Sequence, residues 1–222
     1  PLRWEERYKQ VGGKKDITPE SFYGCCVCIS SAGFALEGLC AACVDWHDNI
    51  AVNLYRNGTV RTPAIDLAME TCYPEEDTVR VQIGAVRKQV ALSLRIPAWS
   101  KITLCHVKGA DGTVEKHKAV SGTYLRIERT WQEGDEITLT FDMNPRVITP
   151  QDYDAESTVT DRYAIARGPV VFAIDGTGDT EPVVIPTGDL AFPVSTEEAA
   201  IPCVQALCLP TAGGNAVLTD YA

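Results

Sequence analysis

Apolar and polar residues alternate along most of this chain from about residue 49 onward. The alternation runs through NIAVNLY (49–55), AIDLAMETCYP (64–74), TVRVQIGA (78–85) and KQVALSLRIPAW (88–99), and it resumes in KITLCHVKG, GTYLRIERTW and DEITLTFDM. A period of two is typical of β-strands that bury one face. Turn sequences such as DG at 111–112 and QEGD at 132–135 separate the runs. Short strands with this punctuation predict an antiparallel β-sandwich.

The pattern continues less regularly towards the carboxyl end. RYAIARGPVVFAID (162–175) predicts a strand pair or one long bent strand, and CVQALCLP (203–210) with the following AVLTDY predicts the last strands. The segment 176–202 is rich in Gly, Pro and Thr and is expected to be a loop. We expect residues 49–175 to form one sandwich to which 203–219 returns, with Trp99 and Trp131 at least half buried.

A different pattern precedes the strands. Residues 1–22 are polar and contain Gly12, Gly13 and Pro19, which favours an extended arm. Residues 22–46 are mostly apolar with many small side chains, which predicts a helix that neighbouring elements should bury. The expected domains are therefore an arm and helix over 1–47 and a β-sandwich region over 48–222.

Composition and charge narrow the classes of function. Hydrophobic residues make up 45% of the 222 residues and charged residues 23%, as in ordinary globular proteins. A formal net charge of -10 argues against nucleic-acid partners, because phosphates need clustered Lys and Arg. The sequence has no apolar run long enough to cross a bilayer and no start typical of a signal peptide. The nine cysteines follow no secreted disulfide framework, so we expect mostly free thiols and a cytoplasmic location.

Five of those cysteines lie between Tyr23 and Cys43, in YGCCVCISSAGFALEGLCAAC. Cys25, Cys26 and Cys28 are either thiolate ligands of zinc or a buried structural cluster, and their spacing alone leaves both readings open. The pair Cys40 and Cys43 is expected to pack inside the helix. The remaining cysteines should be inert core residues, and the three histidines surface or packing residues; they are Cys72, Cys105, Cys203, Cys208, His47, His106 and His117.

An ordered set of motifs extends over nearly the whole chain from Tyr23. It consists of Gly24-Cys25-Cys26, VNLY (52–55), LRIPAWS (94–100), GTYLRIERTWQEGDEITLTFDM (122–143), AIARGPVVFAID (164–175) and LTDYA (218–222). In this set the chain resembles the carboxyl-terminal half of glycoside hydrolase family 127, the β-L-arabinofuranosidase-like group. The resemblance implies an amino-terminal (α/α)6 barrel that holds the active site, followed by β-sandwich domains. This chain would contain only the last barrel helix and the sandwich portion.

The resemblance also implies roles for the cysteines. Cys25 would be the nucleophile of a retaining route through a glycosyl-cysteine, and Cys25 and Cys26 would bind zinc together with a cysteine and a glutamate of the barrel. A separate glutamate would be the acid/base. Cys28 departs from the family pattern and is a further candidate zinc ligand, which leaves open which cysteine attacks. We expect the chain by itself to lack zinc and activity, because the barrel residues have no counterpart in it.

Three hypotheses follow from these residues. The chain is a piece of a glycoside hydrolase acting on arabinofuranoside-type sugars, a non-catalytic structural or carbohydrate-binding sandwich, or a thiol or zinc protein unrelated to sugars. Its expected partners are the missing barrel and a carbohydrate substrate of the parent protein, or a second copy of the chain that covers the helix. No sugar affinity is expected of the sandwich alone, because Tyr55, Tyr124 and Trp131 alternate with core positions.

Overall fold

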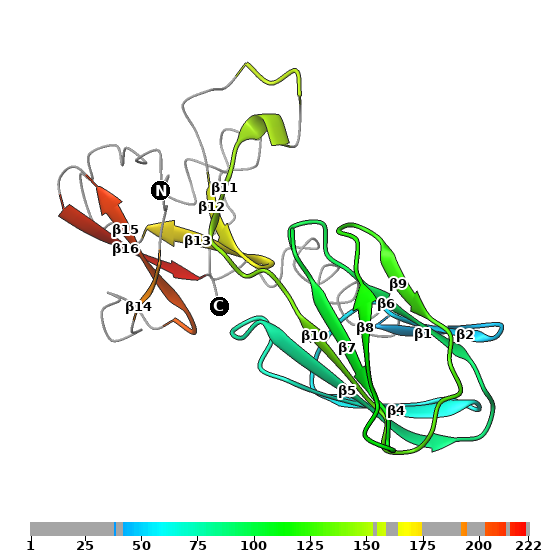
Figure 1. Ribbon diagram of the computed structural model, residues 1–222. Helices are drawn as coiled ribbons and strands as arrows, with labels where there is room; N and C mark the ends of the chain where they lie inside the picture. The colour runs from blue at the N-terminus through cyan, green and yellow to red at the C-terminus, as the bar shows by residue number, and fades with distance from the viewer. Residues whose placement is uncertain are drawn as a thin grey trace, which may run out of the picture. The chain divides into compact units, whose positions relative to one another are not determined.

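The computed structural model describes residue 38 and residues 42–152, 155–158, 164–174, 192–194, 203–211 and 214–220. The chain divides into two compact units, Pro1–Ala42 and Cys43–Ala222. In the described residues, strands of three sheets account for most of the regular structure (Figure 1). No helix in this part of the chain is long and apolar enough to span a membrane.

A four-stranded sheet forms the first layer of the sandwich. It contains β1 (Cys43–Trp46), β2 (Asn49–Val52), β6 (Ala91–Arg95) and β9 (Tyr124–Ile127), in the order β1-β2-β6-β9. Two of its three strand pairings, β1 with β2 and β6 with β9, are antiparallel, whereas β2 and β6 run parallel, with Asn49 opposite Ala91 and Val52 opposite Leu94. Residues 53–90, which include three strands of the second sheet, provide the crossover that a parallel pair requires.

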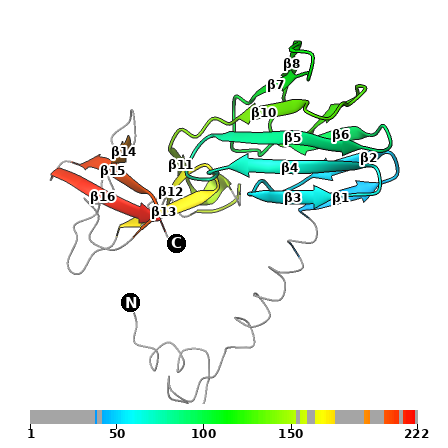
Figure 2. The same ribbon diagram turned by 90° about the horizontal axis from the view of Figure 1, so that it is seen from below.

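A six-stranded antiparallel sheet forms the second layer. Its order is β3-β4-β5-β10-β7-β8, and Figure 2 shows β3, β4 and β5 side by side. The strands are β3 (Gly58–Arg61), β4 (Ile65–Thr71), β5 (Thr78–Val86), β10 (Glu136–Thr140), β7 (Leu104–Lys108) and β8 (Val114–Lys118). Burial alternates strictly in β4 and in the first half of β5, as the period-two pattern predicts.

The core lies between these two sheets. Its fully buried side chains alternate along the strands of both layers and include Ile50, Leu67, Val81, Leu92, Leu94, Val107, Ile127, Trp131, Ile137 and Leu139. Trp131 is 1% exposed, and Trp99 is partly buried against the same cluster. The predicted antiparallel sandwich and the burial of both tryptophans are confirmed.

The third sheet is built from the carboxyl-terminal third of the chain. It contains β11 (Arg146–Ile148), β12 (Ala164–Arg167), β13 (Val170–Ile174), β16 (Gly214–Asp220), β15 (Ala206–Thr211) and β14 (Phe192–Val194), in that order. A 3-10 helix, η2 (Pro150–Asp152), follows β11. This sheet has its own small core around Ile165, Phe172, Leu207, Leu209 and Leu218.

Two predictions about element placement are wrong. Residues 164–174 and 206–220 pair with each other in the third sheet instead of joining the sandwich, because each segment finds its hydrogen-bonding partners in the other. The helix predicted over 22–46 lies largely outside the described residues, in which Gly38 is helical, but Cys43–Trp46 form strand β1. Their apolar residues suited either structure, and pairing with Asn49–Val52 decides for the strand.

Candidate functional site

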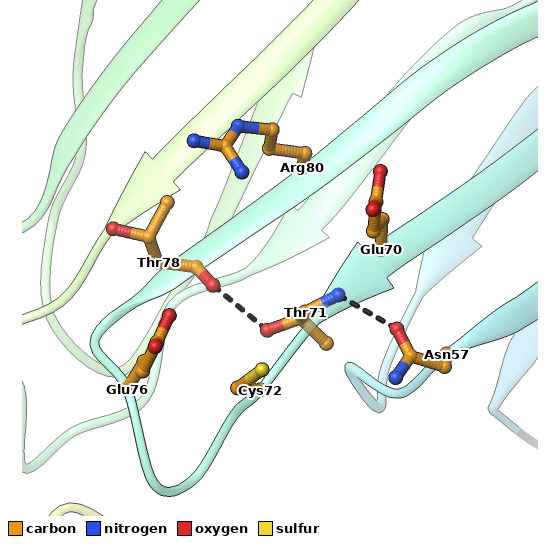
Figure 3. A pocket seen from close by; sticks show the side chains of 7 residues that line it. All are labelled: Asn57, Glu70, Thr71, Cys72, Glu76, Thr78 and Arg80. Carbon is orange, nitrogen blue, oxygen red and sulfur yellow. Dashed lines mark hydrogen bonds between the residues drawn. The ribbon is translucent and has the colours of Figure 1, made fainter.

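A polar pocket lies at the turn that connects β4 to β5 (Figure 3). It encloses about 320 Å³. The side chains around it are Asn57, Glu70, Thr71, Cys72, Glu76, Thr78 and Arg80. Glu70 and Arg80 are directly opposite each other in the β4–β5 ladder, and both are exposed. They face outward because their neighbours Met69 and Val79 point into the core.

Hydrogen bonds hold the rim of this pocket in place. The main-chain N–H of Thr71 donates to Oδ1 of Asn57 at 2.7 Å, and the Thr71 hydroxyl donates to the carbonyl of Thr78 at 2.7 Å (Figure 3). The N–H groups of Glu75 and Glu76 both donate to the carbonyl of Cys72, at 2.8 and 3.1 Å. These bonds pin a tight turn, so the carboxylates and the guanidinium project from a fixed backbone.

The pocket offers acceptors, donors and one thiol to a small polar ligand. Glu70 and Glu76 supply carboxylates, Arg80 a guanidinium and Thr78 a hydroxyl. Sequence reasoning missed this pocket because its residues look like ordinary positions of two strands and the turns beside them. One signal in the sequence was available. Glu70 and Arg80 carry opposite charges and lie at matching positions on the two sides of a turn, as a cross-strand pair does.

Cys25, Cys26 and Cys28 lie outside the described residues. In the ranges that are described, no group of three or more His, Cys, Asp or Glu side chains is placed to hold a metal ion. Nothing in the described structure therefore tests the assignments of Cys25 as nucleophile or of the three cysteines as zinc ligands.

The histidines lie apart from one another. His47 is exposed in the β1–β2 turn, whereas His106 and His117 are partly buried on β7 and β8. His106 faces away from the buried Cys105, as the strand alternation predicts, so these two neighbours do not converge on one ion. The interpretation of all three as surface or packing residues is confirmed.

The cysteines of the sandwich and third sheet differ in exposure. Cys105 and Cys208 are buried as predicted, and Cys203 is half-buried. Cys72 is exposed, so its assignment to the core is wrong; it follows the last residue of β4, where the inward alternation ends.

Burial makes two of these thiols poor nucleophiles. It raises the pKa of Cys105 to about 12. Burial, followed by the nearby charge of Asp45, raises the pKa of Cys43 to about 11. Because the thiolate is the reactive form, both thiols are poor nucleophiles near neutral pH.

The motif Trp131-x-x-Gly134-Asp135 has a structural role. The indole N–H of Trp131 donates to the carbonyl of Val90 at 2.9 Å, and the main chain of Trp131 exchanges two hydrogen bonds with the side chain of Gln89. The Asp135 carboxylate, 1% exposed, accepts hydrogen bonds from the N–H groups of Ala110 and Gln132. These contacts tie three loops of the sandwich together and keep the Trp131 and Asp135 side chains buried.

Comparisons with known proteins show which proteins this chain resembles in sequence and in fold. Residues 49–143 match the family model of the GH127 middle domain of β-L-arabinofuranosidases. A search of curated proteins found no significant match. The matched range covers the strands of the sandwich from β2 to β10 and ends before the third sheet.

Solved structures share the fold over most of the chain. A glycoside hydrolase is 23% identical with a TM-score of 0.64, over 92% of this chain and 40% of its own. A GH127 β-arabinofuranosidase is 21% identical with a TM-score of 0.71, over 90% and 37%. A GH127 β-L-arabinofuranosidase from Geobacillus stearothermophilus T6 is 20% identical with a TM-score of 0.67, over 88% and 34%. The chain thus spans between about a third and two fifths of these proteins. Residues 49–143 are therefore similar to the GH127 middle domain, and the fold of the chain is similar to a portion of the β-L-arabinofuranosidase chains.

Proposed function

We propose that this chain belongs to a glycoside hydrolase acting on arabinofuranoside-type sugars, in which the sandwich supports a catalytic barrel supplied outside these 222 residues. The observation that carries the proposal is the match of residues 49–143 to the GH127 middle domain. The share of the solved relatives that the chain spans, 34 to 40%, leaves room in such a protein for a separate catalytic domain.

The proposed chemistry centres on the cysteines before the sandwich. Cys25 is the nucleophile that attacks the anomeric carbon, and Cys25, Cys26 and Cys28 contribute zinc ligands that barrel residues complete. A bound zinc ion would keep the coordinating thiols deprotonated at neutral pH. As the C–S bond forms, the glycosidic bond breaks and the aglycone leaves with a proton from a glutamate of the barrel. Water, deprotonated by the same glutamate, then hydrolyses the glycosyl-cysteine and regenerates the thiolate.

The sandwich has the properties that a supporting domain needs. Its core is continuous between two sheets, and the network around Trp131 and Asp135 fixes the loops that join them. Barrel residues must be held to within a fraction of an ångström of the sugar, so a rigid neighbour favours catalysis. In this proposal the domain contributes positioning, and the residues before it contribute the chemistry.

The experiment joins the chain to the sequence that its gene encodes upstream. The longer protein should bind stoichiometric zinc and hydrolyse an aryl arabinofuranoside, whereas the 222-residue chain should do neither. Cys25→Ser should abolish turnover, and Cys72→Ser, at an exposed thiol of the sandwich, is the matched control that should leave it unchanged. Full activity of the Cys25→Ser protein would refute the nucleophile and point to Cys26 or Cys28. A longer protein with no zinc and no hydrolysis would refute the proposed function.

A further inference from the structure

The outer face of the four-stranded sheet carries two exposed aromatic rings. Trp46, at the end of β1, is 69% exposed, and Tyr124, at the start of β9, is 50% exposed. Both face away from the core, because their strand neighbours alternate with them and point inward, as the buried Ile127 of β9 shows. The strand register therefore places both rings on one side of a sheet whose other side packs in the sandwich.

Polar side chains between the two rings are held by hydrogen bonds. The Oδ1 atom of Asn49 accepts from the Ser93 hydroxyl at 2.8 Å and from Nη1 of Arg126 at 3.2 Å. The Tyr124 hydroxyl donates to Oδ1 of Asn53 at 2.7 Å. These bonds join β2, β6 and β9 on the outer face, so the rotamers are set before any ligand arrives.

The ring of Trp46 is also positioned by its surroundings. His47 lies edge-on to it, with ring centroids 5.5 Å apart. Across the sheet, Trp46 of β1 is level with Asn49 of β2 and Ala91 of β6. Tyr124 of β9 is level with Arg95 of β6, four residues further along that strand. Four residues along the strands and three strands across separate the rings, which corresponds to a diagonal of roughly 20 Å. A chain of several sugar units would be needed to reach both.

The side chains on this face and at its edges carry equal numbers of positive and negative charges. Lys88, Arg95 and Arg126 are positive, while Asp45, Asp48 and Glu128 are negative. Two of the positive groups are paired locally, Lys88 with Asp48 and Arg126 with Glu128. Such a surface offers no net attraction to a polyanion, and the acidic chain as a whole opposes one. An uncharged ligand rich in hydroxyl groups fits it better.

We propose that the outer face of the four-stranded sheet binds a neutral oligosaccharide. The apolar faces of two sugar units pack on Trp46 and Tyr124, and hydroxyl groups between them bond to Asn49 and Arg126. The sequence predicts no aromatic platform because Tyr55, Tyr124 and Trp131 alternate with core positions. The alternation is real, but it places Tyr124 on the outer side.

This inference does not rest on the proposed hydrolytic function. The strands of this face lie within residues 43–127, and the proposed binding uses neither the cysteines before β1 nor a barrel. A sugar that binds here is held without being cleaved. Failure of one proposal therefore leaves the other standing, and the two are measured by different assays.

The test is calorimetric titration of the full 222-residue chain with arabinohexaose, accompanied by tryptophan fluorescence. We expect measurable millimolar binding and a change in the emission of the exposed Trp46. Trp46→Ala and Tyr124→Ala should each weaken binding by about 2- to 10-fold, the range expected for loss of one aromatic contact. Trp46→Phe and Tyr124→Phe keep a ring and should retain most of the affinity.

Two comparisons make the result decisive. Val114→Ala removes an apolar side chain, 61% exposed, from β8 of the other sheet and should leave binding unchanged. Circular dichroism of each variant checks that it is folded. Absence of binding by the unaltered chain would overturn the proposal. So would affinities of Trp46→Ala and Tyr124→Ala that are as high as that of the unaltered chain. A change in sedimentation for Trp46→Ala without any sugar binding would identify the face as a protein interface and would overturn it too.

Discussion

Replacing Asp135 by alanine removes a buried carboxylate that joins two loops of the sandwich. Its Oδ1 accepts the N–H of Ala110 at 2.9 Å and its Oδ2 accepts the N–H of Gln132 at 3.1 Å. Nη2 of Arg129 lies 3.5 Å from Oδ2, while the Arg129 guanidinium stacks over Trp131 at 5.4 Å. The substitution thus leaves two main-chain donors without their acceptor and a mostly buried cation without one of its partners.

The expected cost follows from these bonds. A hydrogen bond to a charged group contributes about 1.5–3 kcal/mol to stability. Water can reach part of the freed backbone, so the lower end of that range applies to each of the two bonds. We expect Asp135→Ala to lower the free energy of unfolding by about 3–4 kcal/mol, a large share of the ~5–15 kcal/mol typical of a folded protein. Asp135→Asn keeps one acceptor oxygen and should cost about half as much.

The measurement is urea denaturation of the full chain, followed by tryptophan fluorescence and circular dichroism. Asp66→Ala is the matched control, because Asp66 pairs with Arg87 at 2.8 Å on the surface and its loss should shift the midpoint far less. An Asp135→Ala protein with the midpoint of the unaltered chain would refute the stabilising role of these bonds. A shift equal to that of Asp66→Ala would refute the claim that burial makes the difference.

Three further predictions concern the same domain and its connection to the third sheet. At mildly alkaline pH, iodoacetamide followed by peptide mass spectrometry should label the exposed Cys72 well before Cys105, whose pKa burial raises to about 12; equal labelling would contradict the burial. The hydroxyl and the main-chain N–H of Thr113 donate to the Asp111 carboxylate and lower its pKa. The stability that these bonds contribute is therefore fully present above pH 3.8, the ordinary pKa of an aspartate, and is lost as the pH falls through the lowered pKa. Asp111→Asn should therefore have a lower urea midpoint than the unaltered chain at neutral pH but not in strong acid, and a constant difference would be evidence against this. Gly168 has a φ of 56°, and a Cβ there would lie 2.5 Å from Cε of Met143, so Gly168→Ala should cost roughly 1–2 kcal/mol. Urea denaturation should show a smaller cost of Gly168→Ala in a Met143→Ala background than in the unaltered chain, and an equal cost would contradict the predicted clash.

Much of the architecture could be predicted from the sequence because strands with one buried face have a period of two. The runs that became β4, β5 and β10 show that period clearly, and they form the second layer in the expected antiparallel manner. Local composition was likewise sufficient for Trp131, whose size and apolar surface favour burial wherever a core exists. The ordered motifs pointed to the GH127 relationship that the family model supports over 49–143.

The tertiary structure alone decided which strands pair and which face of each strand is covered. Alternation shows that Tyr124 and Leu125 face opposite sides, but only packing against the second sheet makes Leu125 the inward residue and leaves Tyr124 in solvent. The parallel pairing of β2 with β6, and the assignment of 164–174 to a third sheet, depend on hydrogen bonds between segments far apart in the sequence. Such long-range pairings have no signature in local composition, because any exposed strand edge offers the same donors and acceptors. The positions of Trp46 and Tyr124 on a common surface are a consequence of that pairing.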